Sequence, residues 1–453
     1  MLYLRLKNYR LATLLFIFVS YLLFSTQSGT AQSTGTGDLP LISIAALELQ
    51  GGFRLPTSRF GDDEYAIHSY SPGVIAYNPE NESLYTVSHD YHQGIGEFAI
   101  PTVVAGTTVA DYATATLLQN FRGFHTDGQA PTGIDSNFRV TGMALVDNKL
   151  MVNYINWYDG AGSETDTSVV FQDPTNLADS AIVGPFQLGG AAHAAGWFTP
   201  IPTEWQAELG GDFIAGHAHG SINSRLSIGP PAHVLTASDL TSAASGGPVA
   251  TTPVLDFNIS NPLYDKNMYD SSTTTFKAIL YNHDLRNRLW TEISGAAYGF
   301  IVPGTGTYMT LGFAGGFHSG IGYKITQNNG NLCGGPCSYD ANDNYNHYWL
   351  WKVSDLVKVK RGELVASEVR PYEYGKLDTV NNLARLKGAA YDAQNQRLFV
   401  SLQAGDTLQQ YNKPPLILVY SLDPTVVAPP VTESDDQCFV IKNSKQKAAV
   451  VCL

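Results

Sequence analysis

Residues 73–88, Gly-Val-Ile-Ala-Tyr-Asn-Pro-Glu-Asn-Glu-Ser-Leu-Tyr-Thr-Val-Ser, carry the pattern that decides the fold. A short apolar run leads into a polar turn rich in Asn and Glu, and a second run of β-forming residues follows. Residues 388–401, Gly-Ala-Ala-Tyr-Asp-Ala-Gln-Asn-Gln-Arg-Leu-Phe-Val-Ser, repeat this order near the other end of the chain. Two short runs joined by such a turn are typical of neighbouring strands in one antiparallel sheet.

Weaker copies of this unit occupy residues 141–152, 194–215 and 294–311. A second recurring feature is an apolar run that ends at Ser and Asp, which we expect to be an edge strand stopping at a turn; it occurs at residues 236–240, 353–356 and 420–423. Units of four short strands repeated in this way predict an all-β β-propeller of about five blades, with five to seven allowed. A large β-sandwich is the alternative. The near-match of the first and last units favours the propeller, because that fold closes a ring by bringing its ends together.

The first 31 residues have the three parts of a secretory signal peptide. Arg5, Lys7 and Arg10 supply the positive start, residues 11–24 are almost wholly apolar, and small residues end the segment at Ala31. As a helix, the apolar run rises only about 21 Å, short of the roughly 30 Å hydrocarbon core of a bilayer. We therefore expect residues 1–31 to be cleaved, a propeller over residues 32–424, and a product that is secreted or periplasmic.

The charge of the chain argues against some classes of partner. The full sequence carries a net charge of −13, and residues 1–31 contribute three basic and no acidic residues. An acidic chain disfavours nucleic acid and anionic lipid as general partners. We expect a monomer with no membrane span after the signal peptide.

Four cysteines lie in the last third of the chain. We expect Cys333 to pair with Cys337 across a Gly-Gly-Pro turn, and Cys438 to pair with Cys452 at the ends of a hairpin. A four-cysteine zinc site is the alternative, although the spacing is poor for zinc. Residues 425–437 are rich in Pro, Val, Ser and Asp, and we predict a linker there, followed by a C-terminal β-hairpin over residues 438–453.

Several segments resemble a group of secreted bacterial hypothetical proteins that are β-propeller-like and for which no activity is established. The resemblance covers most of the chain after residue 31 and is carried by Gly52-Phe-Arg-Leu-Pro56, Ala76-Tyr-Asn-Pro79, Tyr348-Trp-Leu-Trp351, Val353-Ser-Asp-Leu356 and Gly388-Ala-Ala-Tyr-Asp392. These motifs are strand and turn signatures. The resemblance therefore implies one domain and leaves the function open.

Histidines supply the first candidates for chemistry. His89-Asp90-Tyr91-His92 directly follows a predicted strand, and as a loop it is able to supply a general base or a metal ligand, whereas the alternative is a polar hairpin tip. His217 and His219 are two apart, so on a strand they point the same way and are able to share a cation. The alternative for them is hydrogen bonding near the propeller axis. Arg225 lies close to this pair in sequence.

Two further segments are candidates for binding. Residues 340–344 resemble the start of a calcium loop, and a loose Ca²⁺ site is possible there, although Tyr345 and Trp351 stand where an EF-hand needs Gly and Glu. Aromatic and polar side chains mingle in two runs that suit stacking on sugar rings, or else packing between blades. The candidates in those runs are Trp157, Tyr158, Asp159, Tyr345, His347 and Trp349.

The fold predicts where a ligand would bind more clearly than it predicts which ligand. Loops from all blades of a propeller gather at one end, the default site, and fold alone selects no chemistry. We expect binding of an extracellular glycan or another small ligand there. The alternatives are a polysaccharide lyase or hydrolase that uses His89, His92, His217, Tyr158 and Arg225, and a scaffold for protein partners. No motif of a serine hydrolase, a nucleotide-binding loop or a zinc protease supports those classes.

Overall fold

The structure is a computed structural model of the chain. It describes residues 39–106, 108–124, 138–156, 159, 162–219, 226–266 and 275–429, together with the backbone of two strands, Cys438–Lys442 and Ala448–Cys452. The described residues all belong to one compact unit, Thr36–Leu453. The predicted signal peptide lies outside the described residues. None of the described helices is long and apolar enough to cross a membrane.

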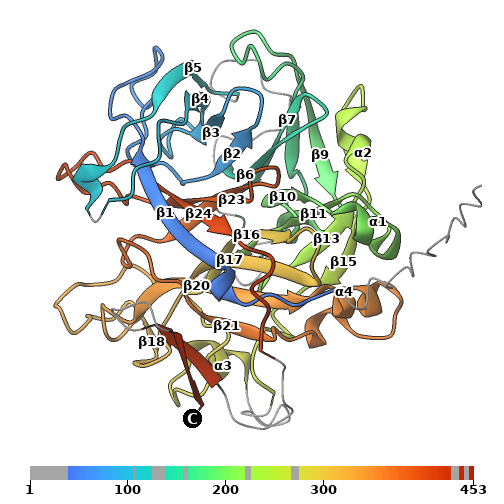
Figure 1. The fold of residues 1–453 in the computed structure, drawn as a ribbon, viewed down its shortest axis with the longest axis vertical. Helices are drawn as coiled ribbons and strands as arrows, with labels where there is room; N and C mark the ends of the chain where they lie inside the picture. The colour runs from blue at the N-terminus through green and yellow to red at the C-terminus, as the bar shows by residue number, and fades with distance from the viewer. Residues whose placement is uncertain are drawn as a thin grey trace, which may run out of the picture. The chain divides into compact units, whose positions relative to one another are not determined.

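Most of the described strands belong to five sheets, which we call blades, and each blade contains four antiparallel strands side by side (Figure 1). The first blade comprises β2 (Ile75–Asn78), β3 (Ser83–Val87), β4 (Ile95–Ala99) and β5 (Thr116–Arg122). The second comprises β6 (Phe138–Val146), β7 (Lys149–Asn156), β8 (Ser168–Phe171) and β9 (Ile182–Leu188), with β14 (Gly247–Val249) added in parallel to β9. The third comprises β10 (Trp197–Pro200), β11 (Phe213–Gly216), β13 (Ala232–Leu235) and β15 (Thr252–Leu255).

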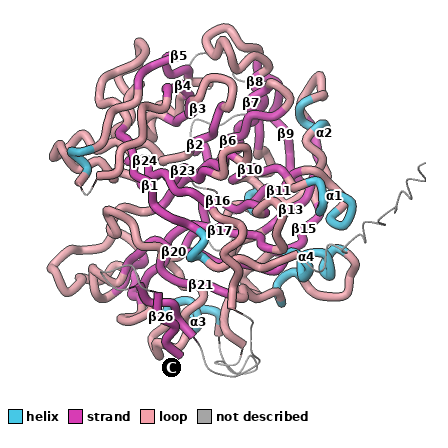
Figure 2. Tube along the Cα trace, in the orientation of Figure 1, coloured by secondary structure: helices cyan, strands magenta, loops and turns pink. Residues whose placement is uncertain are grey.

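The last two blades depart from the simple order at one edge each. The fourth comprises β16 (Gly295–Ile301), β17 (Thr307–Gly315), β20 (Asn344–Lys352) and β21 (Glu373–Lys376), with β12 (Ala218–His219) added beyond β16. The fifth comprises β22 (Leu386–Asp392), β23 (Arg397–Leu402), β24 (Leu416–Leu422) and β1 (Leu47–Arg54). Helices are few and short among the described residues, as Figure 2 shows: α1 (Thr203–Leu209), α2 (Ser238–Thr241), α3 (Phe276–Tyr281) and α4 (Val353–Lys360).

The first strand of each blade lies at the inside of a ring. In the order β2, β6, β10, β16 and β22, each of these strands contacts the next, and β22 contacts β2. Glycine permits the approach at the tightest point: a Cβ on Gly142 would lie 1.8 Å from the carbonyl oxygen of Gly196. The prediction of a β-propeller with five blades is therefore confirmed, and the sandwich is excluded.

The ring closes by combining the two ends of the domain in one blade. The N-terminal β1 pairs with β24 in antiparallel register from Leu47 opposite Leu422 to Arg54 opposite Leu416, and Figure 1 shows the two strands side by side. The Arg54 Nε lies 2.7 Å from Oδ2 of Asp406, whose side chain is buried in the loop after β23. Strand pairing and this ion pair together fasten the first strand to the last blade.

The five sequence units correspond to the first two strands of the five blades. The prediction for the Ser/Asp segments is wrong in detail, because β13, β20 and β24 are third strands, each paired on both sides. After β13 and β20 the chain enters the short helices α2 and α4, since Ser and Asp readily occupy a first helical turn.

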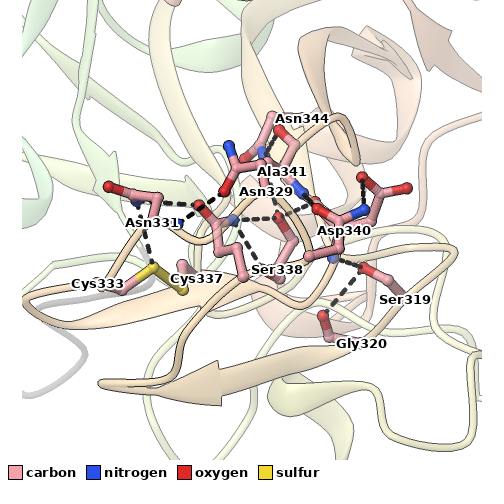
Figure 3. Close-up of a disulfide and its surroundings, with 12 residues drawn as sticks. Ser319, Gly320, Asn329, Asn331, Cys333, Cys337, Ser338, Asp340, Ala341 and Asn344 are labelled. Atoms are coloured by element: carbon pink, nitrogen blue, oxygen red, sulfur yellow. Dashed lines mark hydrogen bonds between the residues drawn. A yellow bond between two sulfur atoms is a disulfide. The ribbon is translucent and has the colours of Figure 1, made fainter.

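Two of the predictions near cysteines, the Cys333–Cys337 disulfide and the C-terminal hairpin, are present in the structure. Cys333 and Cys337 form a disulfide beside the small hairpin of β18 (Ile321–Tyr323) and β19 (Pro336–Ser338), as predicted (Figure 3). In the C-terminal hairpin, β25 (Cys438–Lys442) pairs with β26 (Ala448–Cys452) and places Cys438 opposite Cys452. The side chains of that second pair lie outside the described residues, so its disulfide stays a prediction.

Candidate functional site

The topology decides which loops share an end of the ring. The inner strands all begin at one end, which we call the mouth. Because neighbouring strands within a blade are antiparallel, each second strand ends at the mouth and each third strand begins there. The loop between the second and third strands of every blade therefore lies at the mouth. These loops include His89, Asp159, His217, His219 and the Cys333–Cys337 disulfide.

The loop between β3 and β4 holds the predicted His89–His92 run, and it is a loop as the site required. His92 is buried, and its Nδ1 lies 2.8 Å from Oγ of Ser88. The Nδ1 of His89 accepts a hydrogen bond of 3.0 Å from the backbone N–H of Tyr91, and burial lowers the pKa of the His89 imidazole. Both histidines thus help to hold the loop in place. The His89 ring also packs against aromatic neighbours.

Those neighbours are three tyrosines that the sequence analysis did not select as a group. The ring centroid of His89 lies 4.8 Å from Tyr65, 5.3 Å from Tyr70 and 5.0 Å from Tyr91. We call these four residues the aromatic cluster. Tyr70 and Tyr91 are 62% and 68% exposed, so the cluster presents ring surface to solvent. Two exposed tyrosines that pack against His89 form a suitable surface for stacking against a sugar ring.

His217 and His219 lie on a segment that crosses between blades. After β11 of the third blade, the short β12 pairs with Gly295 and Ala296 at the inner edge of the fourth sheet. The segment therefore runs inside the innermost strands, close to the axis as one of the two interpretations expected. The ring of His219 lies 5.5 Å from that of Phe313.

Two cationic side chains from the fifth blade also pack against the Phe313 ring. The Lys387 Nζ lies 4.4 Å from the centroid of the Phe313 ring, and the Arg385 Cζ lies 5.0 Å from it. We call His219, Phe313, Arg385 and Lys387 the basic cluster. Cations over an aromatic face are attracted by the ring quadrupole, and this attraction holds both side chains near one point.

Protein atoms surround the basic cluster, but its side chains still reach solvent. Arg385 is exposed, while Lys387 and His219 are partly exposed. Burial, with the neighbouring charge of Arg385, lowers the pKa of Lys387 to about 7, and Asp90 acts in the opposite direction. Burial also lowers the pKa of His219, and the charges of Lys387 and Arg385 reinforce the effect. Among the described residues, the side chains of Arg385 and Lys387 form no hydrogen bond and no ion pair, although the Arg385 backbone carbonyl accepts one hydrogen bond from the Gln403 N–H.

Asp90 connects the two clusters. It directly follows His89 of the aromatic cluster, and its carboxylate interacts electrostatically with Lys387 of the basic cluster. The Nε of Arg139, near the start of β6, lies 4.0 Å from Asp90 Oδ1. Burial raises the pKa of Asp90, and the charges of Arg139, His89 and Lys387 oppose that rise. The mouth thus combines exposed aromatic surface with the two cationic side chains of Arg385 and Lys387.

The other predicted ligand-binding residues do not join this arrangement. Tyr345, His347 and Trp349 on β20 are buried, and the Trp349 Nε1 donates a hydrogen bond of 2.9 Å to the carbonyl oxygen of Leu289. The carboxylate of Asp159 accepts hydrogen bonds from the Glu164 N–H and from the Ser163 hydroxyl, within its own turn. Trp157, Tyr158 and Arg225 lie outside the described residues.

The segment considered for calcium uses its carboxylates internally. Asp340 accepts hydrogen bonds from the Asn328 side chain and from the Asn342 N–H, next to the disulfide loop drawn in Figure 3. Asp343 accepts four, from the N–H groups of His318 and Ser319 and from the hydroxyls of Ser319 and Tyr345. These donors stabilise the loop on their own, and a Ca²⁺ site there stays a prediction.

A different group has the composition of a metal site. One donor atom each from His193, His233 and Asp256 lies within 4.8 Å of the others. This group of three residues leaves no signal in the sequence, because its members are 40 and 23 positions apart and match no compact ligand motif. The pair predicted to share a metal, His217 and His219, is not part of this group.

Comparison with known proteins gives no family. No family model matches the chain, and neither does any curated protein. Among solved structures, the WD40 repeats of RRP9 align at 7% identity with a TM-score of 0.28, over 85% of this chain and 100% of that one. The holo PQQ domain of pyranose dehydrogenase from Coprinopsis cinerea aligns at 11% identity with a TM-score of 0.29, over 85% of this chain and 93% of that one. U3-55K aligns at 8% identity with a TM-score of 0.29, over 84% and 100%. Scores this low carry no argument about function, and the propeller assignment rests on the strand order of this chain.

Proposed function

We propose that the protein binds an anionic glycan at the propeller mouth. In this proposal, a carboxylate or sulfate of the sugar lies against Arg385 and Lys387, and an adjoining ring stacks on Tyr70 or Tyr91. The observation that carries the proposal is that the side chains of Arg385 and Lys387 pack together on Phe313 and form no hydrogen bond or ion pair with any described residue. An acidic group is the natural partner for two such cations.

The charge of the whole chain strengthens this argument. The sequence carries 40 acidic residues against 27 basic ones, so carboxylates are in excess and still none is paired with Arg385 or Lys387 within the described part of the chain. Burial disfavours the charged form of Lys387, and a bound anion would restore it. The aromatic cluster adds a sugar-binding surface next to this charge, which favours an anionic saccharide over a simple anion.

Binding to defined oligosaccharides tests the proposal. Isothermal titration should compare uronate-containing, sulfated and neutral oligosaccharides of equal length on the purified protein. Arg385→Gln should weaken binding of the anionic ligands by about tenfold or more, because a charge-assisted hydrogen bond contributes roughly 1.5–3 kcal/mol. Tyr91→Ala should weaken binding of any ligand that stacks there. Lys358→Gln, on α4 at the other end of the ring, is the matched control and should leave affinity unchanged. Equal binding of neutral and anionic ligands, or affinity that survives Arg385→Gln, would contradict the proposal.

One observation favours a second candidate, elimination at a uronate. A lysine with a pKa of about 7 is suited to accept a proton near neutral pH, and Arg385 is placed to neutralise the carboxylate that acidifies the neighbouring C–H. In that reaction the base takes the proton at C5, the C4–O4 bond breaks, and a C4=C5 double bond forms. The cleaved oxygen is protonated by solvent. Absorbance of the unsaturated product, present in the unaltered protein and absent in Lys387→Met, separates this activity from binding alone.

A further inference from the structure

A group of two imidazoles and one carboxylate lies between the second and third blades. His193 ends a short 3₁₀ turn, Ala191–His193, in the connection from β9 to β10. His233 lies on β13, and Asp256 follows the end of β15, the strand that pairs with β13. The Nδ1 of His193 is 2.6 Å from Asp256 Oδ1, and the Nε2 of His233 is 3.7 Å from the same oxygen.

His233 is the residue that ordinary packing does not explain. Its side chain is 3% exposed, and its Nε2 atom has no hydrogen-bond partner although it is directed at Asp256. Its Nδ1 lies 3.4 Å from the hydroxyl of Thr251. A buried ring nitrogen without a partner is costly, because it has lost its hydrogen bond to water.

The surrounding loop is built to bring the backbone against this ring. A Cβ on Gly190 would lie 2.5 Å from His233 Nδ1, so only glycine lets the loop approach so closely. The three residues also line an open hollow of about 420 Å³, together with Glu164, Thr251 and Asn258 among others. The group is therefore held on one side by packed backbone and open on the other.

We propose that His193, His233 and Asp256 bind one divalent transition-metal ion of the zinc class. Two imidazoles and a carboxylate suit Zn²⁺ and its neighbours in the first transition row, whereas Ca²⁺ and Mg²⁺ prefer oxygen ligands. With ligand bonds of about 2.1 Å, adjacent donors in a tetrahedral or octahedral shell lie about 3.0–3.4 Å apart. The present donors lie within 4.8 Å of one another, so side-chain rotations that change their separations by about 1–1.5 Å bring them to that spacing. The proton now shared by His193 Nδ1 and Asp256 leaves Nδ1 when the metal binds.

A hydrogen-bonded Asp–His pair is the competing explanation. It accounts for the 2.6 Å contact between His193 and Asp256 but leaves the His233 Nε2 at 3.7 Å from the same carboxylate, beyond hydrogen-bond distance. A metal ion gives that nitrogen a partner and leaves coordination positions open towards the hollow. The site also adjoins the mouth, because the backbone N–H of His217 donates a hydrogen bond of 2.8 Å to the carbonyl oxygen of His193.

Metal binding is testable without knowledge of any substrate. The protein, freed of its purification tag and treated with a chelator, should be titrated with ZnCl₂ by calorimetry, and its metal content measured after gel filtration. We expect about one Zn²⁺ per chain, and a rise in thermal unfolding temperature with added Zn²⁺. Replacement of Zn²⁺ by Co²⁺ should produce visible d–d absorption.

His193→Gln and Asp256→Asn should weaken Zn²⁺ binding by about 100-fold and abolish the thermal shift. Both side chains are partly exposed, at 19% and 26%, so these variants test the site even if the more deeply buried His233→Gln fails to fold. His318→Gln, at an exposed histidine after β17 of the fourth blade, is the control and should bind Zn²⁺ normally. Absence of stoichiometric Zn²⁺ uptake by the folded protein, or uptake that is unchanged in His193→Gln and Asp256→Asn, would overturn the proposal.

Discussion

Lys387→Met should make the protein more stable at acidic pH while impairing the proposed site. The Lys387 side chain lies near the start of an inner strand with its Nζ over Phe313, and burial lowers its pKa from 10.5 to about 7. Keeping an ammonium charged in that place therefore costs free energy of folding. Methionine has a similar length, removes the charge and can replace the cation–π contact with a favourable sulfur–aromatic contact to Phe313.

The magnitude follows from the two pKa values. The difference between 10.5 and about 7 corresponds to a ceiling of about 5 kcal/mol. Part of the Lys387 side chain reaches solvent, which screens the charge, so we expect a gain of about 1–2 kcal/mol on substitution. Residues that serve a binding site commonly carry such a cost in stability.

The pH dependence has a definite sign. Below pH 7, folded and unfolded chains both hold the lysine proton, and the folded chain bears the full cost. Between pH 7 and 10.5 the unfolded chain holds more protons at this group, so the contribution of Lys387 to the free energy of unfolding becomes less unfavourable as pH rises. The stability difference between Lys387→Met and the unaltered protein should therefore be largest near pH 6 and shrink steadily towards pH 10.

Urea unfolding of both proteins at pH 6, 8 and 9.5 measures that difference directly. Lys358→Met is the matched control, because Lys358 is exposed and pairs with Asp355 on α4. Its effect should stay within about 0.5 kcal/mol at every pH. A Lys387→Met protein that is no more stable than the unaltered protein at pH 6, or whose advantage is independent of pH, would refute the reasoning.

Three other predictions concern the ring, the disulfide and the mouth. Gly142→Ala should destabilise the fold by about 2–4 kcal/mol in urea unfolding, because its Cβ would lie 1.8 Å from the Gly196 carbonyl oxygen; a loss below 1 kcal/mol would argue against close packing of the inner strands. Replacing Cys333 and Cys337 together by Ser should cost about 2 kcal/mol or less, since the bond closes a loop of only four residues' separation, and circular dichroism should show an intact fold. Affinity for an anionic oligosaccharide should fall as pH rises from 6 to 9, because Lys387 loses its charge over that range; titrations in which affinity rises instead would contradict the assigned role of that residue.

The propeller was predictable because each blade begins with the same local chemistry. Pairs of short β-forming runs recur five times and became the first and second strands of the five blades, and the turn that joins them contains Asn or Asp in the first, second and fifth blades. The outer strands were harder to predict, since they are short and differ in partner: the first blade ends in β5, whereas the fifth ends in β1 from the other end of the chain. Pairing over such sequence distances leaves no local signal.

The candidate site was less predictable for a related reason. The His89–His92 loop and the His217–His219 pair were found because closely spaced histidines attract attention in a sequence. Arg385 and Lys387 are separated by one apolar residue just before the unit at residue 388, and a Lys/Arg alternation of this kind ordinarily marks a solvated strand face. Their candidate role becomes visible only in the folded ring. There, the start of β22 lies at the mouth, and both cationic side chains pack against Phe313.

Two other arginines of the ring differ from Arg385 in having carboxylate partners. Arg54 is paired with the buried Asp406, and Arg397 is paired with both Glu82 and Asp392. Arg385 and Lys387 have no such partner among the described residues and instead rest on an aromatic ring with access to solvent. The Asp90 carboxylate acts on Lys387 electrostatically but forms no ion pair with it among the described residues. An external anion would supply that partner, and the opposite effects of Lys387→Met on stability and on binding would separate this explanation from incidental surface charge.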